Sequence, residues 1–545
     1  MRAVKRAGGI VLSMAMALSL LAPAESMAAK QPKMSKSRAT VQVGKTLTLS
    51  VKNAAKKAKI TWGSKQKKIA KVVQSSNKKA KIRGVKAGKA TITAKYKLGK
   101  KKKTLSCKVT VQDKSNARKT VTPTGAPSSS PLASSVPPAP SAVGPSAPAA
   151  TDQPASETPA QSFKWVTTWG TAEEKCDVTK DAMPKQALPD TTVREIIRVT
   201  TGGDKLRLRL SNQYGDSDVE IKSMHLAKQV KADESTIDPA TDQAVTFEGS
   251  EEFVIPAGQV IVTDEVAFPV NALDNVAVSI YFGTAPEKNV TGHRGARATT
   301  YQVEGNQVSE ETFKRPKTTT SWFFLADVSI WSPAKSKAVV CFGDSITDGY
   351  GTDATYLGKK PDSYTRWIDY FAKRLQADES KNHISLINEG IGANSILGDY
   401  PTDAGKDRFA RDLLEHDGVA YCIILFGVND LNKLPNASKY NELLPEYQKM
   451  VKLCHDNGIK VYGAPILPFG TSDYYSEGSE QVRTMINDWM RSADSQMDGI
   501  IDFESAVADP ENPKNVLEDY THDDGLHPYD GYEAMANAID LKLFE

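Results

Sequence analysis

One apolar, β-branched run constrains the fold of this chain more than any other feature. Residues 338–342 read Ala-Val-Val-Cys-Phe, and Gly343, Asp344 and Ser345 follow at once. A short apolar run that ends in turn residues is typical of a buried parallel strand. Open α/β sheets place their ligand sites at the carboxyl ends of such strands, so Ser345 is expected at that edge. Alone, however, this pattern is more often a strand-to-helix turn with a serine N-cap.

The alternation of strand and helix patterns around this run predicts the architecture. The predicted strands are residues 338–342, 384–388, 421–426, 460–466 and 500–503. The predicted helices are residues 365–375, 404–415, 440–455, 480–493 and 532–543. Such alternation indicates a parallel sheet that is covered on both faces by helices. We therefore predict an α/β domain over residues 337–545.

Three further motifs in this domain carry residues with chemistry. Residues 387–394 read Ile-Asn-Glu-Gly-Ile-Gly-Ala-Asn, residues 425–430 read Leu-Phe-Gly-Val-Asn-Asp, and residues 523–528 read Asp-Asp-Gly-Leu-His-Pro. In this order, and together with Gly-Asp-Ser, they resemble the four sequence blocks of the GDSL, or SGNH, hydrolases. The resemblance implies a serine esterase on a flavodoxin-like, three-layer parallel sheet. Four ordered blocks are far more specific than any one of them.

The chemistry of ester hydrolysis explains these residue types. The hydroxyl of Ser345 is a weak nucleophile and needs a base within hydrogen-bond reach. His527 can accept a proton near neutral pH, and Asp524, three residues earlier, can hold its imidazole in the required tautomer. In the family, the matching Asp-x-x-His supplies both partners of the serine. The side-chain amide of Asn429, with backbone N–H groups of Ser345 and of the second block, can stabilise the oxyanion.

The second block departs from the family pattern at one position. When the block is aligned on Asn388 and Ile391, the usual oxyanion glycine falls at Ala393. A backbone N–H does not require a glycine, so Ala393 is retained as the predicted donor. A positive φ at that position would strain an alanine.

The last block also offers a different interpretation. His522, Asp523, Asp524 and His527 have the residue types of a metal site. The order of the four blocks favours a catalytic triad instead, and we predict neither a metal nor another cofactor.

The N-terminus has the pattern of a secretory signal peptide over residues 1–28. Basic residues precede an apolar run at residues 10–21, and Ser26-Met27-Ala28 offers small residues for cleavage. The run is too short to span a membrane comfortably. We expect a secreted, extracellular protein without a transmembrane anchor, either soluble or associated with the cell surface.

Residues 29–113 form a predicted basic domain. Between Lys30 and Thr110 the sequence has about two dozen lysines and arginines and no Asp or Glu. Short alternating strands predict a small β-sandwich, and residues 84–94 resemble the closing motif of bacterial Ig-like group 2 domains. The positive charge fits two interpretations about equally well. The domain could bind an anionic cell wall or an acidic glycan, or it could be a solvated spacer. Export and the lack of interleaved aromatic residues argue against nucleic acid.

Residues 114–162 are rich in Pro, Ser, Ala and Thr and predict an extended linker. Strand patterns return over residues 163–336 and predict a second, jelly-roll-like β-sandwich. Residues 165–169 and 207–213 resemble the accessory domain of a xylan-acetylesterase-like subset of exported SGNH hydrolases. His293 and Arg294 could reach towards the active site. Such residues more often fill a loop, and that is the expectation here.

Together these patterns predict a secreted serine esterase that hydrolyses O-acyl esters, mainly O-acetyl esters, of a polysaccharide through an acyl-enzyme. Tyr350, Tyr356, Tyr474 and Tyr475 fall in predicted rim loops and could stack on sugars or be ordinary surface residues. A lipase or general short-chain esterase is the first alternative, although no apolar lid-like run stands near the motifs. A non-catalytic surface-binding protein is the second, and it would not require serine, aspartate and histidine together.

Overall fold

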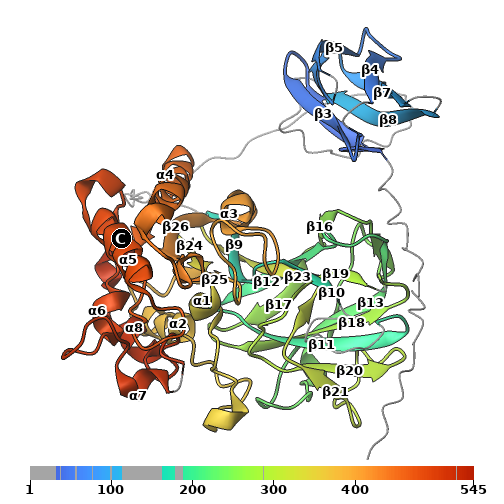
Figure 1. Ribbon diagram of the computed structural model, residues 1–545. Coiled ribbons are helices and arrows are strands. Elements are labelled where there is room, and N and C mark those ends of the chain that lie inside the picture. The colour runs from blue at the N-terminus through green and yellow to red at the C-terminus, as the bar shows by residue number, and fades with distance from the viewer. Residues whose placement is uncertain are drawn as a thin grey trace, which may run out of the picture. The chain divides into compact units, whose positions relative to one another are not determined.

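The computed structural model describes residues 32–112, 162–177 and 188–545, apart from gaps at residues 37, 56–57, 77, 99–100, 287 and 523 (Figure 1). The chain divides into two compact units, Met1–Thr151 and Asp152–Glu545, each of which is described by itself. The predicted signal peptide and all of the predicted linker except Ser162 lie outside the described residues. Within the described residues, no helix has the length and apolar character needed to cross a bilayer.

The first unit is a sandwich of two four-stranded sheets, ordered β1-β3-β6-β5 and β2-β8-β7-β4. The strands are β1 (Lys33–Met34), β2 (Arg38–Gln42), β3 (Thr46–Lys52), β4 (Lys59–Ser64), β5 (Ala70–Ser75), β6 (Lys79–Gly84), β7 (Gly88–Leu98) and β8 (Lys101–Gln112). Alternation decides which face is buried: in β6, Ala80 and Ile82 lie in the core while Lys79 and Lys81 are exposed. The predicted small β-sandwich is confirmed.

The second unit begins with an antiparallel β-sandwich whose main sheets are ordered β16-β12-β23-β9 and β14-β13-β18-β11-β20-β21. Its strands are β9 (Phe163–Gly170), β10 (Glu174–Asp177), β11 (Thr191–Arg198), β12 (Gly203–Ser211), β13 (Val219–Lys228), β14 (Gln243–Ala244), β15 (Phe253–Ile255), β16 (Val260–Val262), β17 (Val266–Val270), β18 (Asn275–Phe282), β19 (Asn289–His293), β20 (Thr300–Glu304), β21 (Lys317–Thr319), β22 (Trp322–Phe323) and β23 (Leu325–Pro333). We call residues 162–333 the sandwich region. Its inward-facing apolar side chains form one buried cluster.

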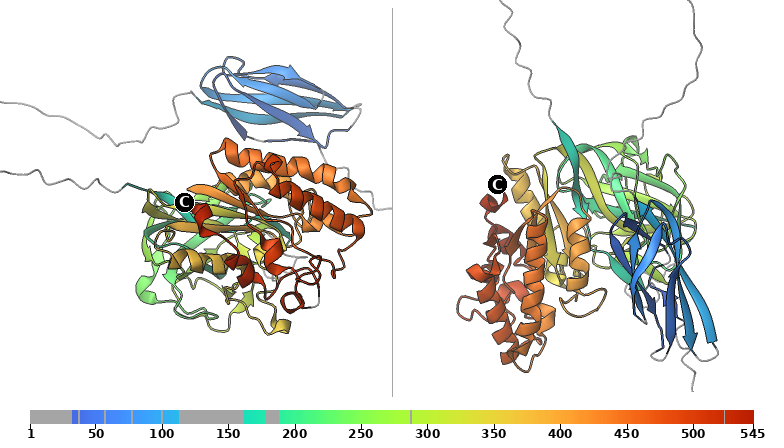
Figure 2. Two further views of the ribbon diagram at one scale, coloured as in Figure 1. Left: turned by 90° about the vertical axis from the view of Figure 1, so that its left-hand side faces the viewer. Right: turned by 90° about the horizontal axis from the view of Figure 1, so that it is seen from above.

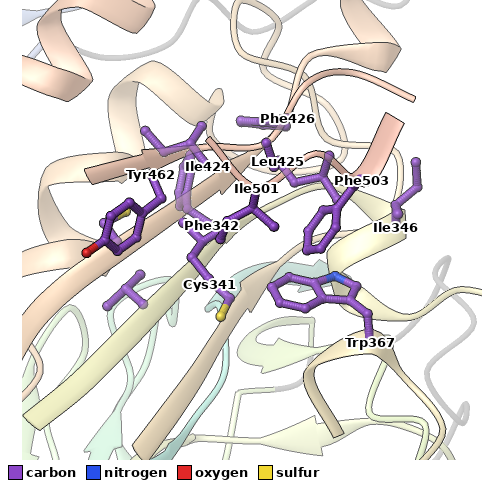
Figure 3. Close-up of a cluster of buried hydrophobic side chains, with 14 of the residues drawn as sticks. Cys341, Phe342, Ile346, Trp367, Ile424, Leu425, Phe426, Tyr462, Ile501 and Phe503 are labelled. Atoms are coloured by element: carbon purple, nitrogen blue, oxygen red, sulfur yellow. The ribbon is translucent and has the colours of Figure 1, made fainter. Parts of the chain in front are cut away.

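A five-stranded parallel sheet forms the rest of the unit, which we call the parallel-sheet region. Its strands are β24 (Lys337–Gly343), β25 (Ile384–Gly390), β26 (Val419–Leu425), β27 (Lys460–Gly463) and β28 (Gly499–Ile500), in the order β25-β24-β26-β27-β28. This order is that of flavodoxin-like folds, as predicted. Figure 3 shows part of its core, in which Phe342 of β24 packs edge-on against Phe426 and Trp367 packs against Phe503.

Helices cover both faces of the sheet, as Figures 1 and 2 show. The helices are α1 (Ser345–Asp348), α2 (Trp367–Ala377), α3 (Gly405–Leu414), α4 (Tyr440–Asp456), α5 (Glu477–Arg491), α6 (Phe503–Val507), α7 (Glu518–Thr521) and α8 (Tyr532–Asn537). Helix α2 packs with α8 and β25, whereas α3 and α4 pack together against β24, β26 and β27. The sheet is therefore buried on both sides, which explains its nearly continuous apolar strands.

Three predicted elements were wrong in extent. The predicted strand over residues 460–466 ends at Gly463, and the other two end early at polar caps. The predicted strand over residues 500–503 ends at Ile500, because Asp502 caps α6 and accepts a hydrogen bond from the backbone N–H of Ser505. The predicted helix over residues 532–543 ends at Asn537. There Asp540 caps a separate 3₁₀ turn by accepting from the backbone N–H of Lys542. In both places a local carboxylate cap overrides the apolar pattern.

The two regions of the second unit share an extensive interface along β9 and β25. Ser385 donates its hydroxyl to the Thr167 carbonyl, and the backbone N–H of Leu386 donates to Thr200 Oγ1 at 3.0 Å. At Gly170 an added Cβ would lie 2.8 Å from Ile387 Cγ2, so only glycine allows this approach. β25 is an edge strand of the parallel sheet, and β9 covers it.

A buried histidine also bridges this interface. His416 Nδ1 lies 3.0 Å from Asp327 Oδ2 in β23, and its Nε2 lies 2.9 Å from Glu389 Oε1 in β25. Because both neighbours are carboxylates, both ring nitrogens carry a proton. Burial lowers the pKa of His416, but the hydrogen bonds and charges of Asp327 and Glu389 outweigh that effect and raise the pKa to about 10.

We expect His416 to make the unit less stable in alkali. The folded-state pKa lies above the ordinary value of about 6.5, so the contribution of His416 is complete below that pH. It is lost as the pH rises towards 10, by on the order of a few kcal/mol. Urea unfolding at pH 6.5, 8 and 9.5 should show this fall in the wild type and a flatter profile in His416→Gln.

His455 provides the matched control, because it pairs with Asp498 at the surface and its side chain is 38% exposed. His455→Gln should keep the wild-type dependence of unfolding free energy on pH. Parallel pH profiles for the wild type and His416→Gln would contradict the assignment of a buried imidazolium.

Candidate active site

Ser345 lies where β24 turns into α1. The strand ends at Gly343, where an added Cβ would come within 2.4 Å of the Leu425 carbonyl oxygen, so the turn tolerates only glycine. Asp344 is the N-cap of α1 and accepts the backbone N–H of Ile346 at 3.1 Å. Burial raises the pKa of Asp344 to about 7. The tight turn lifts the serine to the carboxyl edge of the sheet.

The structure brings the three predicted residues Ser345, His527 and Asp524 together. Ser345 Oγ lies 2.9 Å from His527 Nε2, and His527 Nδ1 lies 2.6 Å from Asp524 Oδ2. Since the carboxylate only accepts, Nδ1 carries the proton and Nε2 is free to accept one from the serine. Asp524 Oδ1 accepts the backbone N–H groups of Leu526 and His527, which fixes its plane. The arrangement has the geometry of a nucleophile, a base and an orienting carboxylate.

Tyr529 is a further partner of this group. Its hydroxyl donates to Asp524 Oδ2 at 2.6 Å, the same oxygen that binds His527. Burial raises the pKa of Asp524, but His527 and then Tyr529 outweigh that effect and hold the pKa well below its usual range. The orienting carboxylate therefore stays ionised.

The second block and Asn429 follow β25 and β26, the two strands that pair with the nucleophile strand β24. Asn429 Nδ2 donates to the carbonyl of Asn394 at 2.8 Å, and the Tyr474 hydroxyl donates to Asn429 Oδ1 at 3.3 Å. These bonds use the oxygen and one N–H of the amide and fix its plane. The side chain of Asn429 thus bonds to the neighbouring block and not to its own turn, which Asp430 closes with a backbone bond to Gly427.

Arg408 of α3 ties the second block to the nucleophile strand. Its buried guanidinium donates to the carbonyls of Gly343 and Glu389 and to Asn394 Oδ1, at 2.9–3.0 Å. Asp412 Oδ2 lies 2.6 Å from it and balances its charge. Asn394 is therefore held by Arg408 on one side and bonded to Asn429 on the other.

Ala393 has a φ of +62°, the left-handed conformation that favours glycine. The strain anticipated from the sequence is thus present in the backbone.

The sequence-based expectation for His293 was wrong. His293 does not fill a loop but ends β19 of the sandwich region, where it is buried and lies 3.0 Å from Asp348, the last residue of α1. Arg294 binds Glu174 instead. The reason is tertiary, since the sandwich region packs its β19 end against α1.

The four predicted rim tyrosines have different environments. Tyr350 is 39% exposed, and its ring centroid lies 4.5 Å from that of His527. Tyr356 is exposed, Tyr474 binds Asn429, and Tyr475 donates to Glu477. Tyr350 and Tyr356 therefore remain available to a ligand beside the histidine.

The metal-site interpretation of the last block gains no support from the geometry. His522 pairs with Asp530, away from the bonds of Asp524, and Asp523 is outside the described residues. Across the part of the chain that the structure describes, no group of three or more His, Cys, Asp or Glu residues has metal-binding geometry.

Family models match two parts of the chain. The model of the GDSL-like lipase/acylhydrolase family matches residues 341–534. Residues 341–534 are a GDSL-like hydrolase domain. The model of the bacterial Ig-like domain (group 2) matches residues 28–109. The predicted resemblances to GDSL hydrolases and to bacterial Ig-like group 2 domains are therefore confirmed. The reaction class of the GDSL domain is the hydrolysis of carboxylic esters.

Solved structures that align with the chain include two family two carbohydrate esterases. The one from Clostridium thermocellum is 15% identical, with 62% of this chain and 90% of that chain covered and a TM-score of 0.30. The one from Cellvibrio japonicus is 11% identical, with 70% and 97% covered and a TM-score of 0.29. Est24, a carbohydrate acetylesterase from Sinorhizobium meliloti, is 19% identical, with 37% and 96% covered and a TM-score of 0.28. Comparison with curated proteins gave no match.

Sequence reasoning missed several residues of the GDSL site. Tyr529 stands two residues after His527, and Asn394 closes a quoted motif, so both had a weak local signal. Arg408 lies inside a helical pattern, where a lone arginine is normally a solvated residue. Only its complete burial distinguishes it.

We expect Asn429→Ala to damage the chemical step more than substrate binding. An oxyanion donor acts mainly as the carbonyl oxygen becomes negative, so kcat should fall about a hundred- to a thousandfold. KM should change little, since the ground-state carbonyl gains less from that donor. The measurement is kcat and KM on an aryl acetate, with a melting curve of the same preparation.

Asn436→Ala is the control, because the exposed Asn436 only caps a 3₁₀ turn by accepting the backbone N–H of Ser438. It should leave kcat unchanged. A normal kcat together with a lowered melting temperature in Asn429→Ala would remove Asn429 from the site.

Proposed function

We propose that the protein is an exported serine esterase that removes O-acyl groups, mainly O-acetyl groups, from a polysaccharide. The observation that supports this most is the continuous hydrogen-bonded chain from Ser345 through His527 to Asp524. A binding protein without catalysis would not need these three groups in this order. The GDSL family match supports ester hydrolysis as the class of reaction.

In the proposed mechanism Ser345 Oγ attacks the ester carbonyl while His527 Nε2 takes the hydroxyl proton. The carbonyl oxygen becomes negative and is stabilised by the backbone N–H groups of Ser345 and Ala393 and by the free N–H of Asn429. When the ester C–O bond breaks, His527 gives its proton to the departing alcohol. Asp524 keeps the imidazolium oriented and stabilises its charge.

The second half of the cycle uses the same residues in reverse. His527 takes a proton from water, and the resulting oxygen nucleophile attacks the acyl-enzyme. The carboxylic acid leaves as Ser345 recovers its proton from His527. Tyr529 holds Asp524 in both halves, because its hydroxyl donates to the carboxylate.

Exposed aromatic side chains near the site support a carbohydrate as the substrate. Tyr350 and Tyr356 are 39 and 66% exposed. A tyrosine ring offers both an apolar face and a hydroxyl, which suits it to stacking on a sugar ring. A lipase or general short-chain esterase remains the first alternative, and substrate preference separates the two.

We propose that residues 1–28 direct export, residues 114–162 form a linker, and the remaining three parts are domains with bounds 29–113, 163–336 and 337–545. The apolar run after basic residues and the Pro- and Ser-rich stretch support this division. The protein would then act outside the cell or at its surface.

We also propose that the basic domain binds an anionic cell wall or an acidic glycan. Exposed cations stand directly opposite one another on the β2-β8-β7-β4 sheet: Lys97 faces Lys59 and Lys102, and Arg38 faces Lys108. Like charges in such positions destabilise a sheet, and a linear polyanion would relieve that repulsion. Arg38, Lys89 and Lys108 line a hollow of about 640 Å³ that would receive it.

Acetyl esters should be hydrolysed faster than long-chain esters. The reason is that exposed tyrosines rim the site and that no apolar lid-like run stands near the motifs in the sequence. Initial rates on acetylated xylan and on aryl acetate, butyrate and octanoate test this, with Ser345→Ala expected to show only background hydrolysis. Faster turnover of the octanoate would favour the lipase alternative, and near wild-type turnover by Ser345→Ala would reject the nucleophile.

Binding of the full chain to insoluble polygalacturonate should weaken steeply with salt, because exposed charges are screened beyond about 8 Å at physiological ionic strength. Replacing Arg38, Lys89 and Lys108 with Gln should weaken binding more than replacing Lys71, Lys79 and Lys81, which removes equal charge from the other sheet. Pelleting assays from 50 mM to 500 mM salt measure both effects. Retention that is insensitive to salt, or equal on neutral cellulose, would count against an anionic partner.

A further inference from the structure

The nucleophile turn is held by side chains from the sandwich region. Helix α1 has only four residues, with Ser345 first and Asp348 last. His293 Nε2 lies 3.0 Å from Asp348 Oδ1, and Arg297 Nη2 donates to Asp348 Oδ2. Both oxygens of this buried carboxylate are therefore bound by groups outside the parallel-sheet region.

His293 is a cation in this arrangement. Its Nδ1 lies 3.0 Å from the Ala172 carbonyl oxygen, which can only accept a hydrogen bond, and its Nε2 faces the Asp348 carboxylate. Both ring nitrogens must then carry protons. Glu174 Oε1 lies 3.4 Å from Nδ1 and adds a second negative charge. A buried imidazolium that uses both of its N–H donors is held in one orientation.

The packing around Asp348 leaves the turn no room to move. An added Cβ at Gly295 of the sandwich region would come within 2.5 Å of both Asp348 carboxylate oxygens. On the other side, an added Cβ at Gly390 would lie 2.2 Å from the Asp348 backbone nitrogen. Asn388 Nδ2 donates to the Thr347 carbonyl at 3.1 Å. The turn is thus enclosed between β25 and the sandwich region.

Arg297 also reaches the histidine side of the site. Its guanidinium lies 5.5 Å from the ring centroid of Tyr350, and the Tyr350 ring lies 4.5 Å from that of His527. Asp353 Oδ1 accepts from Arg297 Nη1 at 3.1 Å and completes its charge balance. One cation of the sandwich region therefore contacts both the element that carries Ser345 and the ring that packs on His527.

We propose that His293 and Arg297 are positioning residues, which fix Ser345 at hydrogen-bond distance from His527. On this proposal the sandwich region is a part of the catalytic apparatus and not a separate accessory module. The inference rests on the proposed function, because it concerns how the serine and histidine of that mechanism are placed. An error of about 1 Å in such a placement can cost a hundredfold in rate.

The test uses the full chain with His293→Gln and Arg297→Met, and with Arg297→Lys as the conservative variant. The readouts are kcat and KM on an aryl acetate, the rate of covalent labelling of Ser345 by an aryl phosphonate, and the melting temperature. Both neutralising variants should lower kcat and the labelling rate about ten- to a hundredfold, with KM within about twofold of the wild type. Arg297→Lys, which keeps a charge at that position, should recover part of the loss.

His225→Gln is the matched control. His225 pairs with Asp242 at 3.0 Å in the same region, on β13, and is partly buried. It should lower the melting temperature without changing the labelling rate per folded molecule. If His293→Gln and Arg297→Met behaved as this control does, the cluster would be structural only and the proposal would be overturned. Failure of the proposed function would look different, because the wild type itself would then be neither active nor labelled.

Discussion

The buried guanidinium of Arg408 is the interaction on which the candidate site depends most. It donates to two backbone carbonyls, Gly343 and Glu389, that end neighbouring parallel strands, and to Asn394 in the loop beyond. A buried charge is costly unless every donor is used, and here Asp412 supplies the opposite charge. Because the guanidinium is planar and rigid, it fixes the spacing of the strand ends that carry Ser345 and the second block.

The same principle operates at the boundary between the sandwich and parallel-sheet regions. His416 is bound between Asp327 and Glu389, and His293 between Asp348 and the Ala172 carbonyl. Each imidazolium is satisfied only when both regions are in place, so neither region can move away without leaving a buried charge unpaired. The interface is thus specific as well as extensive. At His293 it contacts α1, the helix that begins with Ser345.

Unlike the buried charges around the candidate site, the charges of the basic domain are exposed. Its cations are exposed on both sheets, and its apolar residues form their own core. Its charge can therefore act on a partner by long-range attraction, which salt screens. The esterase site depends instead on buried, short-range contacts, which salt hardly affects. On the proposed function, one part of the chain would hold an anionic surface while the other hydrolyses esters.

The sequence by itself determined the elements and much of the chemistry. Apolar runs ending in Gly-Asp-Ser or Gly-Val-Asn-Asp specify strands with polar groups at their carboxyl ends, and the orienting Asp524 lies three residues from His527, so their pairing is local. Only the tertiary structure decided which distant groups support them. Arg408, His293 and Arg297 come from a helix face, a strand end and a loop, and their roles arise from complete burial against residues far away in the chain. Pattern and propensity describe neighbours in sequence, whereas burying a charge is a property of the packed whole.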